Sequence, residues 1–107
     1  PAPVQVKGPK LSRKEQRKLE AEKRQQRNKV LNPLKEEFSA LEHTISQLEA
    51  KKAKLTAELA SPEVIADPKK TKTATGAYQQ LTTKLDNAVS RWSKLSEEIE
   101  AHETTLN

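Results

Sequence analysis

Residues that are mostly large and apolar recur at alternating spacings of four and three along two stretches of the chain. The first stretch runs through Leu34, Phe38, Leu41, Ile45, Leu48, Lys52, Leu55 and Leu59. The second runs through Tyr78, Leu81, Leu85, Ala88, Trp92, Leu95, Ile99, His102 and Leu106. This heptad pattern is typical of a coiled coil, in which one stripe of each helix is buried against the other helix. We therefore expect a coiled-coil core of Phe38, Leu41, Ile45, Leu48, Leu55, Leu81, Leu85, Trp92, Leu95 and Ile99.

The two seams are separated by ASPEVIADPKKTKTATG, a stretch with two prolines and a glycine. Two matched seams joined by a short connection predict an antiparallel hairpin. The expected fold class is all-α, with the hairpin occupying residues 32–107. Its expected parts are a helix over 33–60, a loop over 61–75 and a helix over 76–105.

The pattern also predicts which positions face each other across the seam. Pairing the two helices from the expected loop places Phe38 opposite Ile99, Ile45 opposite Trp92, and Lys52 opposite Leu85. In this register Trp92 packs in the core, and the stem of Lys52 lies on its neighbour with the ammonium group in solvent. We expect a monomer, although heptad seams can also pair between two chains.

The region before the hairpin has a different composition. Residues 1–11 are rich in proline and predict a flexible linker. Ser12 with Glu15 forms a capping box, which predicts a helix over 12–31. Asn32 and Pro33 follow, where a new helix can start or one long helix can kink; the sequence leaves both open.

Charge is concentrated near the amino terminus of the chain. Residues 7–29 hold ten basic and three acidic residues, whereas the remainder carries a net charge of −2. On a helix, one half of the circumference would carry Lys10, Arg13, Lys14, Arg17, Lys18, Arg24 and Arg27. A one-sided basic helix suits a polyanion, because neutralised phosphates release counterions and Arg can bind phosphate with two donors. These residues, with Lys69 and Lys70 in a second basic group at the hairpin tip, are the candidate nucleic-acid-binding residues; a solvated charged helix is the plainer alternative.

Other function classes find little support in the sequence. Hydrophobic and charged residues each make up 33% of the chain, which suits a narrow seam better than a globular core with a pocket. There is no cysteine, and His43 and His102 fall on different helices, so we expect neither catalytic nor metal-binding residues. No apolar run is long enough to cross a bilayer. Because the chain has no Met and opens on a linker-like stretch, we expect it to be part of a larger protein.

Three segments in this order resemble the C-terminal domain of ABC-F ATPases of the Uup-like group. They are KLSRKEQRKLEAE, LEHTISQLEAKKAKLTAELASPE and LTTKLDNAVSRWSKLSEEIE, which includes the pair Arg91-Trp92. The resemblance covers about residues 10–103. It implies a cytoplasmic parent protein with two ATP-binding cassettes, which would use ATP and Mg²⁺, whereas this chain contains no cassette motif and no cofactor site.

The resemblance also implies a function. Family members act on ribosomes or bind nucleic acid, and Arg13, Lys14, Arg17 and Lys18 would contact DNA or ribosomal RNA here. One alternative is a coiled coil that docks on a partner protein or on the parent's own cassettes. Another is an arm specific for RNA, like the coiled coil of a tRNA-binding enzyme.

Overall fold

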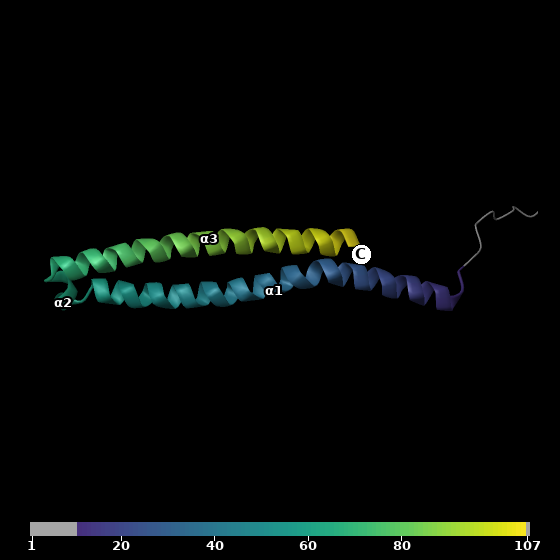
Figure 1. Ribbon diagram of the computed structural model, residues 1–107, viewed down its shortest axis with the longest axis horizontal. Helices are drawn as coiled ribbons and strands as arrows, with labels where there is room; N and C mark the ends of the chain where they lie inside the picture. The colour runs from purple at the N-terminus through teal and green to yellow at the C-terminus, as the bar shows by residue number, and fades with distance from the viewer. Residues whose placement is uncertain (1–10, 107) are drawn as a thin grey trace, which may run out of the picture.

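The computed structural model describes residues 11–106, with side chains described up to residue 104. Its helices are α1 (Arg13–Leu59), α2 (Pro62–Ile65) and α3 (Pro68–Leu106). Helices α1 and α3 run antiparallel, and the short α2 lies at the turn between them (Figure 1). The described residues form a thin rod, in which the 47 residues of α1 alone span about 70 Å. The predicted all-α hairpin is therefore confirmed, while the predicted linker lies outside the described residues except for Leu11.

Helix α1 is continuous across the Asn-Pro step that the sequence left open. It begins with the predicted capping box: the backbone N–H of Glu15 donates to the Ser12 hydroxyl at 3.1 Å, and the N–H of Ser12 donates to the Glu15 carboxylate at 3.3 Å. Pro33 lies inside the helix and removes one backbone hydrogen bond. On either side of it, Leu31 is buried and Leu34 is half-buried. Packing of these two leucines compensates for the lost bond, so residues 12–31 and 33–60 form one helix and not two.

Helix α3 begins at Pro68, eight residues before the predicted start at residue 76. Both prolines of the connection occupy the first position of a helix, where a missing N–H costs nothing. The Asp67 carboxylate caps α3 by accepting from the N–H groups of Lys69 and Lys70, at 3.0 and 3.3 Å. The predicted loop over 61–75 is thus wrong, because prolines read as breaks are here helix starts.

The shorter connection changes the register of the hairpin. Phe38 stacks on Trp92, with ring centroids 5.4 Å apart, and the Lys52 ammonium lies 5.6 Å from the centre of the Tyr78 ring. The predicted partners of Phe38 and Lys52 were Ile99 and Leu85, each one heptad further along α3. Trp92 also lines one groove with Ile45, its predicted partner, and the Lys35–Glu103 pair lies close to the predicted register. The contacts are therefore displaced from the predicted register by less than a full heptad, and the apolar stripes still meet because the same face of each helix stays inward.

The core is a single line of side chains between the two helices. Leu95 is fully buried, and Leu31, Leu48, Ala74 and Ala88 are at most 9% exposed. The other predicted core residues are half-buried: Phe38, Leu41, Ile45, Leu55, Leu81, Leu85, Trp92 and Ile99. The seam thus reaches Leu31 in α1 and Ala74 in α3, beyond both predicted limits.

Ion pairs join the two helices near the open end of the hairpin. The Arg91 guanidinium donates to both carboxylate oxygens of Glu37, at 3.1 and 2.8 Å, and the Lys35 ammonium lies 3.1 Å from Glu103. The hydrogen bonds from Arg91 hold the pKa of the Glu37 carboxyl below its usual value. These pairs lie on the surface and select the relative position of the helices more than they stabilise them.

Candidate nucleic-acid interface

Residues 13–26 of α1 extend beyond the end of α3 as a lone helix, which we call the arm (Figure 1). Every residue of the arm is exposed except Ala21, which is half-buried. Since no second helix covers it, the arm presents its whole circumference to solvent. The basic helix predicted over 12–31 therefore exists as the free end of a longer helix.

The seam of α1 continues into the arm, but its residues change from apolar to basic. Counting back from Leu31 in alternating steps of four and three gives Arg27, Arg24, Glu20, Arg17 and Arg13. Of the five arginines in the chain, four lie on this stripe, and the remaining one is Arg91. At about 100° per residue, the four arginines fall within about 80° of the helix circumference. We call Arg13, Arg17, Arg24 and Arg27 the arginine stripe.

The lysines of the arm lie elsewhere. Lys14, Lys18 and Lys23 lie off the stripe, although the sequence analysis had grouped Lys14 and Lys18 with the arginines; Lys10 lies outside the described residues. The charge of the arm alone does not reveal the stripe. It becomes evident when the heptad count of the hairpin is extended towards the amino terminus.

The arginines of the arm are not engaged by the acidic residues around them. Within the described part of the chain, no ion pair joins Arg13, Arg17 or Arg24 to another side chain. Glu15 accepts the capping hydrogen bond from Ser12. Three guanidinium groups thus point from one face of the arm and are available to an external anion.

Arg27 has a different environment at the junction of the arm and the hairpin. It is half-buried, and with Asn28, Leu31, Lys35 and Glu103 it lines a groove of about 250 Å³ at the end of α3. The Glu103 carboxylate offsets part of the positive charge there. The arm proper, from Arg13 to Arg24, therefore carries the more positive end of the stripe.

The tip lysines lie at the other end of the molecule. Lys70 pairs with Glu63 at 3.8 Å, and Lys69 lies beside it at the start of α3. At about 1.5 Å per residue, the end of α1 is about 50 Å from Arg24. The structure therefore does not bring Lys69 and Lys70 together with the arginine stripe, and the two groups cannot hold the same short ligand.

The residues considered for other chemistry are dispersed or buried. His43 is exposed on α1 and His102 is half-buried near the end of α3. Among the described residues, no group of three or more histidine or acidic side chains could hold a metal ion. The Trp92 ring is occupied by its stack with Phe38, and its indole nitrogen is buried without a hydrogen-bond partner. Across the described residues, no helix has the length and apolar character of a membrane span.

One family model matches the chain, that of the ABC transporter C-terminal domain, over residues 29–106. No curated protein and no solved structure matches. The matched stretch contains the whole hairpin but not the arm, so the SRKEQR opening that contributed to the resemblance lies outside it. Because the match covers the seam of both helices and most of the chain, we conclude that the chain belongs to the ABC transporter C-terminal domain family.

Proposed function

We propose that this chain is a nucleic-acid-binding appendage of a cytoplasmic ABC-F ATPase, and that the arginine stripe contacts the phosphate backbone. The parent protein would supply the ATPase activity, and the hairpin would supply reach and rigidity. The ligand would be duplex DNA or structured RNA such as ribosomal RNA.

The observation that carries the proposal is the change from apolar residues to arginine along the seam of α1, from the hairpin into the arm. The solubility of an exposed helix requires charged residues, but it does not require that the arginines lie on the face that is apolar in the hairpin. Arg suits bidentate binding of phosphate better than Lys, because its planar group presents two donors to two oxygens. A narrow stripe of such groups matches a phosphate backbone that runs along the arm.

Contacts of this kind give affinity with little sequence preference. Phosphate contacts position a protein on nucleic acid but do not distinguish bases. Each neutralised phosphate contributes about −0.9 to the slope of log affinity against log salt on duplex DNA. Three or four arginines therefore predict a slope of about −3 to −4.

The proposal is tested by comparing two triple variants of the full 107-residue chain. One replaces Arg13, Arg17 and Arg24 with Gln, and the other replaces Lys14, Lys18 and Lys23 with Gln. Both remove three positive charges from the same exposed helix, but only the first removes residues of the stripe, three of its four arginines. Binding to duplex DNA and to structured RNA is measured over a salt series.

We expect the arginine variant to lose about tenfold or more in affinity at low salt and about three units of slope. The lysine variant should lose about threefold or less. Equal losses would overturn the role of the stripe and leave only general electrostatic attraction. If the unmodified chain binds neither ligand at about 50 mM salt, where such binding is favoured, nucleic-acid binding itself is refuted.

A further inference from the structure

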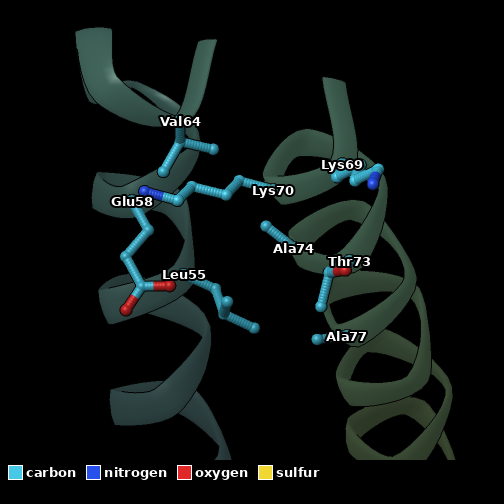
Figure 2. Close-up of a pocket in the computed structure, with 8 residues that line it drawn as sticks. All are labelled: Leu55, Glu58, Val64, Lys69, Lys70, Thr73, Ala74 and Ala77. Atoms are coloured by element: carbon cyan, nitrogen blue, oxygen red, sulfur yellow. The ribbon is translucent and has the colours of Figure 1, made fainter. Parts of the chain in front are cut away.

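The tip of the hairpin contains an apolar groove of about 400 Å³, formed by the end of α1, by α2 and by the start of α3 (Figure 2). Leu55 and Val64 form one wall, and Ala74 and Ala77 form the facing wall on α3. The α3 wall is made of small residues, whereas most of the seam positions further along α3 carry larger side chains. Its volume lies at the low end of the range of ligand-binding pockets in proteins.

Hydrogen bonds within the turn hold the walls of the groove in fixed positions. The Thr71 hydroxyl donates to the backbone carbonyl of Val64 at 2.6 Å, which fixes α2 against α3. Asp67 caps the first turn of α3 through two backbone N–H groups. A ligand would therefore meet a preformed site, which lowers the entropic cost of binding.

An apolar residue also projects at the apex of the hairpin. The side chain of Ile65 is 64% exposed, the highest value among the large exposed apolar residues described. A solubilising turn would place a polar residue there. Ile65 follows Val64, a wall residue of the groove, so two apolar features lie at the end of a rod that is otherwise rich in charge.

The charge around this surface is positive. Residues 51–72 contain six lysines, at 51, 52, 54, 69, 70 and 72, against Glu58, Glu63 and Asp67. Of these acids, Glu63 pairs with Lys70, Asp67 caps α3, and Glu58 lines the groove together with Lys69 and Lys70. The excess of lysines over acidic residues around the tip therefore favours a ligand that is both acidic and apolar.

We propose that the tip groove binds a short acidic segment of a partner protein, with large aliphatic side chains entering the groove and carboxylates facing the lysines. An apolar floor gains from burying aliphatic side chains, which a phosphate backbone does not offer. Base stacking needs an open aromatic face, and the ring of Tyr78 near the tip is covered by the Lys52 ammonium. The tip is therefore a protein-docking surface, separate from the nucleic-acid contact proposed for the arm.

The test uses a fluorescein-labelled helical peptide of about twelve residues, with leucines four apart flanked by glutamates. A second peptide carries lysine in place of glutamate, and a third carries serine in place of leucine. The tested variant of the full chain is Thr73→Glu, because Thr73 is exposed and lines the groove. Thr75→Glu is the matched control: it is exposed on the same helix, receives the same charge, and does not line the groove.

We expect the acidic peptide to bind with a dissociation constant of roughly 10–100 µM, and both altered peptides to bind at least about tenfold more weakly. Thr73→Glu should weaken binding of the acidic peptide by about tenfold and Thr75→Glu by less than about twofold, with circular dichroism unchanged in both. No binding of the acidic peptide at about 1 mM would overturn the proposal, as would equal binding of the lysine peptide or equal effects of the two variants.

Duplex DNA binding is measured with the same variants, which separates this inference from the function proposed for the arm. The tip variants should leave DNA affinity within about twofold of the unmodified chain. If Thr73→Glu instead weakens DNA binding as much as the triple arginine change does, the tip is a nucleic-acid surface and the docking proposal is wrong. A chain that binds neither duplex DNA nor structured RNA would refute the arm proposal and leave the peptide result as it stands.

Discussion

Leu95 is the fully buried side chain of the described seam, and its replacement by Ala gives a direct measure of how tightly the two helices pack. The change removes three carbon atoms from the core. At about 0.8 kcal/mol for each buried methylene, their transfer to water costs about 2.4 kcal/mol. The cavity adds to this cost, but two helices can move together more easily than a multilayer core can. We therefore expect the free energy of unfolding to fall by about 3 kcal/mol.

The matched control is Leu19→Ala, because Leu19 is 42% exposed on the arm, where no second helix covers it. Its cost should stay below about 0.5 kcal/mol, since few contacts are lost and Ala favours the helix. Urea denaturation followed by circular dichroism and by Trp92 fluorescence measures both variants. With a denaturant dependence of about 1.5 kcal/mol per molar, Leu95→Ala should lower the midpoint by about 2 M.

Similar midpoints for the two variants would refute the reasoning. Such a result would mean that Leu95 does not lie between α1 and α3 in solution, and that the helices separate or pair differently. A loss at Leu95 of about 3 kcal/mol with an unchanged denaturant dependence would support the packed seam.

Elsewhere in the hairpin, Gly76 lies inside α3, where an added Cβ would meet open space. Gly76→Ala should therefore raise the free energy of unfolding, measured by urea denaturation, by about 0.5–1 kcal/mol. An unchanged free energy of unfolding would contradict a helix at this position. The lowered pKa of Glu37 should return towards its ordinary value in Arg91→Gln, as measured by NMR titration, and an unchanged pKa would exclude the ion pair. Since the lowered pKa belongs to the folded chain, the pair's contribution is complete above the pKa of the unfolded chain and is lost as the pH falls through the folded value. The summed losses of stability in Phe38→Ala and Trp92→Ala should exceed the loss in the double variant by about 0.5–1.5 kcal/mol, because both changes remove the same ring stack; additive losses would contradict the stack.

Heptad spacing predicted the hairpin correctly because a seam of this length can be buried in few ways. The same spacing could not determine the register, since a shift of seven residues brings equivalent faces together. Register depends on where the connection ends, and that depends on whether Pro62 and Pro68 break helices or begin them. The residues before them, Ser61 and Asp67, belong to the types that precede helices, so the signal was present but ambiguous.

The candidate site, like the fold, was predicted only in part from the sequence. The charge of residues 7–29 indicated a basic helix, but the predicted binding face covered half of its circumference and included Lys14 and Lys18. The narrower stripe depends on knowing that α3 ends near Arg27, which leaves the seam positions of the arm uncovered. The tip groove could not be predicted, because the residues of its α3 wall, Ala74 and Ala77, had been assigned to a loop or to its edge.

The continuity of α1 through Pro33 has a mechanical consequence. The arm and one leg of the hairpin belong to one continuous helix, so a change in the direction of the arm is passed to the leg through the helix itself. At about 1.5 Å per residue, the leg from Leu31 to Leu59 is about 42 Å long. A tilt of the arm by about 10° would therefore swing the tip through about 7 Å. The molecule can act as a lever, in which a ligand bound at the arm sets the position of the tip.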